Sequence, residues 1–256
     1  MDSDQNSKKR HRPHGIQQSG GYVKNRDRQL SKGLSWLLRH SAPKLNLTVS
    51  ADGYVPLSAI LSCDARNFNQ YTEEDVRRVT ESNDKQRFRL EKKSVIWETS
   101  GGHGKGYTFA ENDGGEEVLC IRANQGHSIP GICFDRLLNL ISSDELKDLT
   151  IVHGTFKNVW ENYIKKEGLS RMSRNQIHFA SGLPDGDGVI SGMRRTCQVY
   201  IYIDGAACAE AGIQFYRSDN GVILTAGLED GMLPCCYFER VIDAASGADL
   251  LEKEEL

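Results

Sequence analysis

The chain has 256 residues, of which 38% are hydrophobic, and this length is enough to bury one large core or two small ones. Its formal net charge of -3 at pH 7 argues against a general basic coat for nucleic acid, so RNA binding would need a local cluster of Arg and Lys. No apolar run approaches the roughly 20 residues of a membrane-spanning helix, so we expect no membrane partner.

Residues 1–28 are polar and lack an apolar period, which predicts a disordered basic arm. Its basic residues are Lys8, Lys9, Arg10, Arg12, Lys24, Arg26 and Arg28. The arm could be a tail with no role, could help to hold RNA electrostatically, or could direct the protein to the nucleus. The sequence leaves these alternatives open.

Order is expected to begin near Leu30, where leucines follow helical spacing as far as Leu38. A turn at Asp52-Gly53 precedes a short helix over 56–61, and Thr72-Glu73-Glu74-Asp75 has the form of a capping box that opens a third helix. Strands are expected over 87–90 and 118–121. Three helices followed by a two-stranded hairpin are typical of a winged-helix module, which we assign to residues 29–135.

The segment 93–117 between these two strands is rich in Gly and charge, and we interpret it as a flexible insertion at a hairpin tip. Its stretch Gly101–Gly106 resembles a phosphate-binding loop in composition. It lacks the strand before it and the helix after it that such a loop requires.

A second unit is expected over 148–243. A short strand ends at His153-Gly154-Thr155, a helix follows over 158–166, and further strands are expected over 177–180, 199–203, 215–216 and 222–225. Many short strands with few helices predict an α+β fold with a mixed or antiparallel sheet. The strand–helix alternation and GxGxxG of a Rossmann domain are absent from the sequence. Residues 244–256 are expected to form an acidic tail.

The seven cysteines have no CxxC spacing, which argues against a disulfide framework and against a zinc site. We therefore expect reduced thiols, no metal, and a location in the cytoplasm, the nucleus or both. The N-terminal residues are charged where a signal peptide needs an apolar core.

Four polar groups lie at the ends of predicted elements, where binding sites are usually assembled. They are Arg39-His40, Lys85-Gln86-Arg87, the run from Ile121 to Ser128, and Arg174, four residues before His178. Each alone has an ordinary structural interpretation. Together they are almost all cations or hydrogen-bond donors, without a Ser-His-Asp set, paired carboxylates or a metal-ligand cluster. Such a set suits a ligand that carries several phosphates.

Seven motifs in order resemble those of the tRNA 2′-phosphotransferase family, over about residues 29–240. They are Leu30-Ser31-Lys32 through Leu37-Leu38-Arg39-His40, Asp52-Gly53-Tyr54-Val55, Lys85-Gln86-Arg87-Phe88, Ile121 to Ser128, Val152-His153-Gly154-Thr155, Ile177-His178-Phe179 and Ser218 to Thr225. The segment 93–117 is the main departure. The resemblance implies an N-terminal winged-helix RNA-binding lobe and a C-terminal ADP-ribosyltransferase-like lobe. It implies NAD⁺ as a consumed co-substrate, tRNA with an internal 2′-phosphate as substrate, and no metal; we expect a monomer.

The resemblance also implies site residues. The implied catalytic residues are Arg39, His40, Arg87 and Arg174. The implied cofactor-binding residues are His153, Gly154, Thr155, His178, Ser218, Asn220 and Val222, of which His153, His178 and Val222 occupy the three sheet positions that class ADP-ribosyltransferases. The residues expected to contact RNA or phosphate, or to brace the lobe junction, are Lys85, Arg122, Asn124, Gln125, His127 and Ser128. A structural role for His127 and His178 is an equal alternative.

Two steps are implied by the resemblance. The RNA 2′-phosphate attacks C1″ of NAD⁺ and expels nicotinamide, and the 2″-hydroxyl then attacks the phosphorus to release a plain RNA 2′-hydroxyl. His40 either orients the phosphate or protonates the departing oxygen. The rival interpretations are an enzyme that ADP-ribosylates nucleic-acid ends or protein, and an RNA-binding module without activity.

Overall fold

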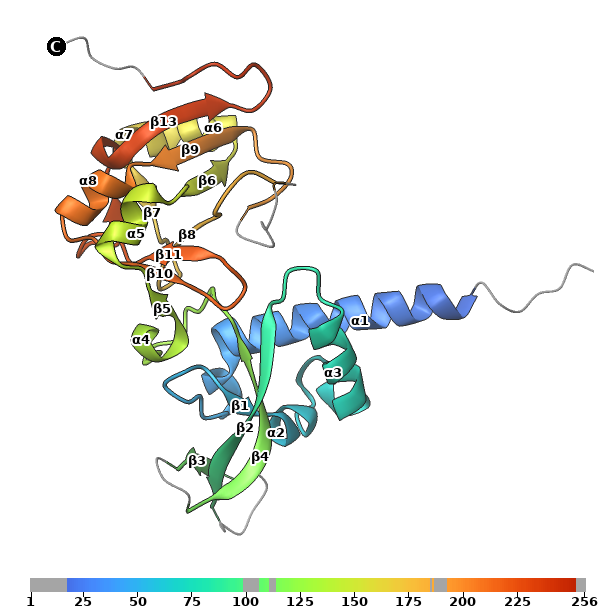
Figure 1. Ribbon diagram of the computed structural model, residues 1–256. Helices are drawn as coiled ribbons and strands as arrows, with labels where there is room; N and C mark the ends of the chain where they lie inside the picture. The colour runs from blue at the N-terminus through green and yellow to red at the C-terminus, as the bar shows by residue number, and fades with distance from the viewer. Residues whose placement is uncertain (1–17, 99–105, 111–113, 185, 187–192, 252–256) are drawn as a thin grey trace, which may run out of the picture.

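The computed structural model describes residues 18–98, 106–110, 114–184, 186 and 193–251. Over these residues the fold is α+β, and the paired strands run antiparallel. Two hydrophobic clusters hold it together: the first is built mainly from residues 30–138 and the second from residues 141–241. They correspond to the lower and upper halves of the molecule in Figure 1. The expected α+β class with antiparallel strands is therefore confirmed.

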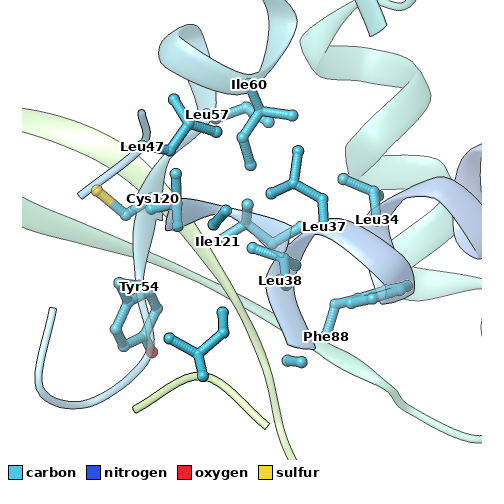
Figure 2. Packing of buried hydrophobic residues seen from close by; sticks show 14 of the residues in the cluster. Leu34, Leu37, Leu38, Leu47, Tyr54, Leu57, Ile60, Phe88, Cys120 and Ile121 are labelled. Carbon is cyan, nitrogen blue, oxygen red and sulfur yellow. The ribbon is translucent and has the colours of Figure 1, made fainter. Parts of the chain in front are cut away.

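The N-terminal half combines helices with a sheet of order β1-β4-β2-β3. Its elements are α1 (Gln18–Trp36), the π-helical turn η1 (Leu37–Ser41), η2 (Pro43–Leu45), β1 (Val55–Pro56), α2 (Leu57–Leu61), η3 (Ala65–Gln70), α3 (Glu73–Glu81), β2 (Phe88–Trp97), β3 (Tyr107–Phe109) and β4 (Glu116–Ala123). Figure 2 shows how Leu34, Leu37 and Leu38 pack against Phe88 and Ile121. This packing fixes the end of the first helix against the central strands.

The first helix begins at Gln18, so residues 18–28 of the expected basic arm belong to α1 rather than to a disordered segment. Ion pairs to α3 explain the difference. Arg26 lies 2.9 Å from Asp75, and Arg78 lies 2.7 Å from Asp27. Ion pairs, instead of a periodic row of apolar residues, thus attach this part of α1 to α3, so the apolar pattern of the sequence does not reveal it. Residues 1–17 lie outside the described residues.

The segment 93–117 is more regular than expected. Strand β2 runs on to Trp97, pairs with β4 as far as Val95 opposite Glu116, and then pairs with β3. Val95 is fully buried and Tyr107 nearly so, which anchors this extension to the first cluster. The interpretation of 93–117 as a flexible tip is wrong for these strands, because Val95 and Tyr107 pack in the core among many charged residues. Residues 99–105 and 111–113 lie outside the described residues.

The C-terminal half holds two main sheets, of order β5-β10-β11-β8 and β13-β9-β6, and a small pair β12-β7. The strands are β5 (Asn139–Leu140), β6 (Val152–Thr155), β7 (Leu169–Ser170), β8 (Ile177–Phe179), β9 (Val199–Ile203), β10 (Phe215–Arg217), β11 (Ile223–Thr225), β12 (Met232–Leu233) and β13 (Phe238–Asp243). The helices are α5 (Ser143–Asp148), α6 (Lys157–Val159), η4 (Trp160–Ile164), α7 (Lys165–Glu167), α8 (Gly205–Glu210) and η5 (Cys235–Tyr237). The short helix α4 (Phe134–Leu137) precedes them and packs in the first cluster through Leu137. A β-bridge between Val152 and Ala180 brings β6 beside the end of β8.

The expected acidic tail is partly folded. The Leu250 N–H donates to the Val241 carbonyl at 2.6 Å, and the Asp249 carboxylate accepts from the Val241 N–H at 3.0 Å. Residues 244–251 therefore return along β13, because Gly247, with a φ of +73°, allows the chain to reverse. Residues 252–256 lie outside the described residues.

Candidate active site

Arg39 and His40 lie in the π-helical turn η1, where the first helix ends. The Ser128 N–H donates to the Arg39 carbonyl at 2.8 Å, and the Ser128 hydroxyl shares a hydrogen bond of 2.9 Å with His40 Nδ1. A π-turn frees backbone groups and is frequent at functional sites. The polar run that follows β4 is thus attached directly to the Arg-His pair.

The Arg39 side chain lies against Gly126, whose φ is +88°. A Cβ atom at Gly126 would lie 3.4 Å from Arg39 Nε, which is ordinary van der Waals contact, so the guanidinium packs directly against this backbone. Arg39 Nε is itself buried without a hydrogen-bond partner among the described residues. Burial, followed by the charges of Arg87 and Arg174, lowers the pKa of Arg39 to about 10. A positive charge held in this way favours an incoming anion.

The cations come from both halves of the molecule. Burial lowers the pKa of Arg87, and burial together with the charge of Arg194 lowers the pKa of Arg174. The pKa of Lys85 is lowered by burial first, and then by Arg87, Arg194 and Arg195. We call Arg39, Lys85, Arg87, Arg174, Arg194 and Arg195 the cation cluster. Positive charges gathered in one place favour the binding of an anionic ligand there, although the whole protein has a net charge of -3.

Arg174 also borders a cavity of about 670 Å³ in the C-terminal half. Its polar lining residues include His153, Thr155, Glu167, Arg171, Gln176 and His178, and its apolar lining residues include Val159, Ile164, Met172 and Met232. This combination of apolar walls with a few polar groups is typical of a small-molecule site. The cavity and the cation cluster therefore share Arg174 as a common boundary.

The two cavity histidines are held by hydrogen bonds. His153 Nδ1 bonds to the His178 carbonyl at 2.9 Å, and His178 Nε2 bonds to Gln125 Oε1 at 2.9 Å. Burial lowers the pKa of His153, and burial with the charges of Arg174 and Arg39 lowers the pKa of His178 to about 3. These pKa shifts favour the uncharged form of both rings. They can serve as hydrogen-bonding groups, and they do not add to the positive charge.

Gly154 has no room for a side chain, because a Cβ atom there would lie 2.6 Å from Cys197 Sγ. Thr155 is buried at the end of β6 and lines the cavity. The expected residues His153, Gly154, Thr155 and His178 are thus brought together by the β6–β8 bridge, and all but Gly154 line the cavity.

Ser218, Asn220 and Val222 are placed elsewhere. They form the buried turn between β10 and β11, where the Ser218 hydroxyl donates to Asn220 Oδ1 at 2.8 Å and accepts from the Val222 N–H at 3.1 Å. Asn220 Nδ2 donates to the Lys85 carbonyl at 2.8 Å, and Val222 packs in the first hydrophobic cluster. None of the three is among the residues that line the cavity.

The run from Arg122 to Ser128 lies between the halves. The guanidinium of Arg122 is buried and pairs with Asp219 at 2.8 Å. Asn124 Nδ2 donates to the Gln86 carbonyl at 2.7 Å, and Gln125 reaches His178. The His127 ring is buried, and its carbonyl accepts from the Asn175 N–H at 2.9 Å.

Sequence reasoning missed Arg194 and Arg195, which precede β9 and join the cation cluster, and it missed Gln176 and Tyr163 on the cavity wall. The adjacent arginines were a visible signal, but no predicted element ended beside them. Within the described residues, no group of three or more His, Cys, Asp or Glu could hold a metal ion. The same part of the chain contains no helix long and apolar enough to cross a membrane.

A family model described as RNA 2′-phosphotransferase, Tpt1 / KptA family, matches residues 25–227. The chain belongs to this family. The tRNA 2′-phosphotransferase 1 of Bos taurus is 43% identical over 85% of this chain and 76% of its own length. That of Homo sapiens is 42% identical, again over 85% and 76%, and the tRNA 2′-phosphotransferase of Saccharomyces cerevisiae is 36% identical over 79% and 80%. Membership of the RNA 2′-phosphotransferase family confirms the resemblance found in the sequence.

Proposed function

We propose that this enzyme removes the 2′-phosphate that splicing leaves inside tRNA and transfers it to NAD⁺. The observation that carries the proposal is the cation cluster beside the cavity, with Arg174 common to both. The products are RNA with a 2′-hydroxyl, ADP-ribose 1″,2″-cyclic phosphate and nicotinamide. The reaction is the final step of tRNA splicing.

In this proposal each half binds one of the two substrates. The N-terminal half acts as a winged-helix RNA-binding lobe, because its helices and its β2–β4 hairpin present Arg39 and Arg87 from neighbouring elements. The C-terminal half acts as an ADP-ribosyltransferase-like lobe that binds NAD⁺ in the cavity. The apolar walls suit the rings of a dinucleotide, and His153 and Thr155 supply hydrogen bonds to its ribose and pyrophosphate.

The residues act mainly through charge. Arg39 and Arg87 hold the 2′-phosphate, because guanidinium groups stay charged and grip phosphate with two parallel hydrogen bonds. Since a phosphate dianion is already a competent nucleophile, its attack on C1″ needs no general base. Arg174 faces the phosphate as the 2″-hydroxyl attacks it, when negative charge builds on the phosphorane oxygens. The pKa of His40 is lowered by burial and then by Arg39 and Arg174, so its neutral ring can orient the phosphate.

No metal takes part in this proposal, and the protein acts as a monomer. The described cysteines are unpaired, which agrees with action in a reducing compartment such as the cytoplasm or nucleus.

The decisive experiment incubates the protein with NAD⁺ and an oligonucleotide that carries one internal 2′-phosphate. We expect release of nicotinamide and ADP-ribose 1″,2″-cyclic phosphate, a dependence on NAD⁺, and full activity in the presence of a chelator. Phosphate removal without NAD⁺ would overturn the proposal. An oligonucleotide that keeps ADP-ribose on its phosphate as the final product would instead identify an ADP-ribosyltransferase of nucleic-acid phosphates.

A further inference from the structure

The turn Lys85-Gln86-Arg87 is unusually constrained for a surface segment. Gln86 has a φ of +43°, a left-handed conformation that L side chains rarely adopt. Such a conformation persists only where the surroundings impose it. The turn carries Arg87, to which the proposed function gives a phosphate contact. Whatever imposes the turn therefore also sets the position of that guanidinium.

The backbone N–H groups of the turn are bound by Asn83, which lies just before the turn in the chain. Asn83 Oδ1 accepts from the N–H of Lys85 at 3.2 Å, from the N–H of Arg87 at 3.4 Å and from Arg87 Nη1 at 3.1 Å. The Gln86 N–H donates to the Asn83 carbonyl at 2.8 Å. These contacts are local in sequence. The three carbonyl oxygens of the turn accept their hydrogen bonds from more distant segments.

The carbonyl side is fixed by two buried asparagines from distant segments. Asn124 Nδ2 donates to the Gln86 carbonyl at 2.7 Å, and the Asn124 N–H donates to the Arg87 carbonyl at 2.9 Å. Asn220 Nδ2 donates to the Lys85 carbonyl at 2.8 Å across 135 residues of chain. All six backbone donors and acceptors of the turn are thereby paired. Asn220 is the contact that comes from the C-terminal half.

The orientation of the Asn220 amide is itself fixed. Its Oδ1 accepts from the Ser218 hydroxyl at 2.8 Å, which leaves the Nδ2 group to face Lys85. The side chain is 1% exposed, so a lost hydrogen bond could not be replaced by bulk water without disturbing the turn. Both ends of the Asn220 amide are therefore bound to protein groups, which suits a structural support of the turn better than a ligand-binding group.

We infer that Asn220 is a positioning residue for the reaction: by holding the Lys85 carbonyl it fixes the turn that aims Arg87 at the RNA phosphate, and it makes that aim depend on the C-terminal half. This inference rests on the proposed function of Arg87. It replaces the expectation from the sequence that Asn220 binds the dinucleotide.

The test compares Asn220→Ala with Thr225→Val as a matched control. Thr225 is fully buried in the same hairpin and its hydroxyl donates to the Gln214 carbonyl at 2.7 Å, so its loss removes a similar hydrogen bond without touching the turn. In single-turnover reactions with saturating NAD⁺ we expect Asn220→Ala to slow phosphate transfer on the order of ten- to a hundredfold. The KM for NAD⁺ should stay within about twofold, and Thr225→Val should retain the normal rate.

A double-mutant cycle shows whether Asn220 acts through Arg87. In an Arg87→Ala background the further change Asn220→Ala should cost nothing more, because the side chain that it positions is gone. Additive losses, or a raised KM for NAD⁺, would overturn the inference and would indicate contact with the dinucleotide. A near-normal rate in a folded Asn220→Ala protein would also overturn it.

Amide hydrogen exchange separates this inference from the proposed function. Exchange at residues 85–88 should accelerate in Asn220→Ala and stay unchanged in Thr225→Val, whatever reaction the protein catalyses. If the protein proved unable to use NAD⁺ and a 2′-phosphate, the proposed function would fail, while this measurement would still test whether Asn220 holds the turn. Unchanged exchange at the turn would show that Asn220 does not hold it, even in an active enzyme.

Discussion

The Arg39 side chain is confined, because its Nε is buried and its guanidinium lies against Gly126. The residue types of the site could be anticipated from the sequence, since Arg39, His40, Arg87 and Arg174 are cations at element ends. The residues that surround these cations could not be anticipated from the sequence. Arg194 and Asn220 reach the same site from segments far along the chain, and spacing carries no information about such contacts. The sequence therefore indicated which cations belong to the candidate site better than it indicated which residues hold them in place.

Arg39→Ala and Arg87→Ala should each lower kcat on the order of a hundredfold or more, because in the proposed mechanism each side chain makes a charge-assisted contact with the phosphate in the transition state. Thermal unfolding should show that both variants remain folded. Arg77→Ala is the matched control, since Arg77 pairs with Glu73 on the exposed surface of α3 and should leave the rate unchanged. A normal kcat in either folded site variant would contradict these assignments.

Arg174→Gln should slow the second step more than the first. In the proposed mechanism, charge is neutralised in the first step as the phosphate joins the ribosyl carbon, whereas negative charge builds on the phosphorane oxygens in the second step. Rapid-quench sampling with NAD⁺ labelled in its adenylate should therefore reveal RNA that carries an ADP-ribosylated 2′-phosphate. Arg174→Lys keeps the charge but loses the two-pronged grip, so it should trap less. Slow turnover without any adduct in both variants would place Arg174 in the first step.

His127 should make stability fall as the pH is lowered. Burial, and then the charges of Arg39, Arg122 and His40, lowers its pKa from 6.5 to about 3. Below pH 6.5 the unfolded chain takes up a proton that the folded protein refuses, so the free energy of unfolding drops until about pH 3. The loss at pH 5.5 is about 1 kcal/mol. Urea unfolding at pH 7 and pH 5.5 should show a smaller drop for His127→Gln than for the unchanged protein; equal drops would contradict the prediction.

Among the elements, α1 and β2 differ most from what the pattern of apolar residues predicts. Both are longer than predicted: α1 starts at Gln18 instead of near Leu30, and β2 ends at Trp97 instead of at Leu90. Tertiary contacts extend them, through Arg26 and Asp27 in the helix and through strand pairing with β3 and β4 in the sheet. Elements with a regular period were predicted well. The strand over 199–203 has the expected bounds, because its apolar residues alternate inward.

Asp75 joins α1 to α3 and should be important for the stability of this half. Its carboxylate accepts from the Thr72 N–H in a capping box and pairs with Arg26 at 2.9 Å and Arg78 at 2.6 Å. Asp75→Ala should lower the free energy of unfolding by about 2 kcal/mol, since a cap and a nearly buried ion-pair partner are lost together. Glu73→Ala, on the exposed side of the same helix turn, should cost under about 0.5 kcal/mol in the same urea titration. Equal costs would show that Asp75 contributes only as a surface charge.

At the scale of the whole molecule, a charged contact ties the two halves together. Asp219, in the turn between β10 and β11, pairs with the buried Arg122 at 2.8 Å and with Arg89 at 2.9 Å. Arg122 also donates to the carbonyls of Asp52 and Leu137, both at 3.3 Å. Its partner lies 97 residues away in the sequence, so this contact was not predictable from spacing.

Asp219→Ala should destabilise the protein on the order of 3 kcal/mol, because it leaves the buried guanidinium of Arg122 without its counter-charge. The double variant Arg122→Met with Asp219→Ala should recover part of this loss, since the apolar Met side chain carries no charge to bury. Urea unfolding of the single and double variants measures both effects. A double variant less stable than Asp219→Ala alone would show that the carbonyl contacts of Arg122 outweigh its pairing.

The first hydrophobic cluster includes Tyr216, Val222 and Leu224, although the rest of it comes from residues before 139. The β10–β11 hairpin therefore contributes to both clusters: Tyr216, Val222 and Leu224 pack in the first, and Phe215 and Ile223 pack in the second. A gene fusion that carried only the first 138 residues would expose the apolar surface that this hairpin covers. The first 138 residues alone are therefore expected to be less stable than the same residues in the whole protein.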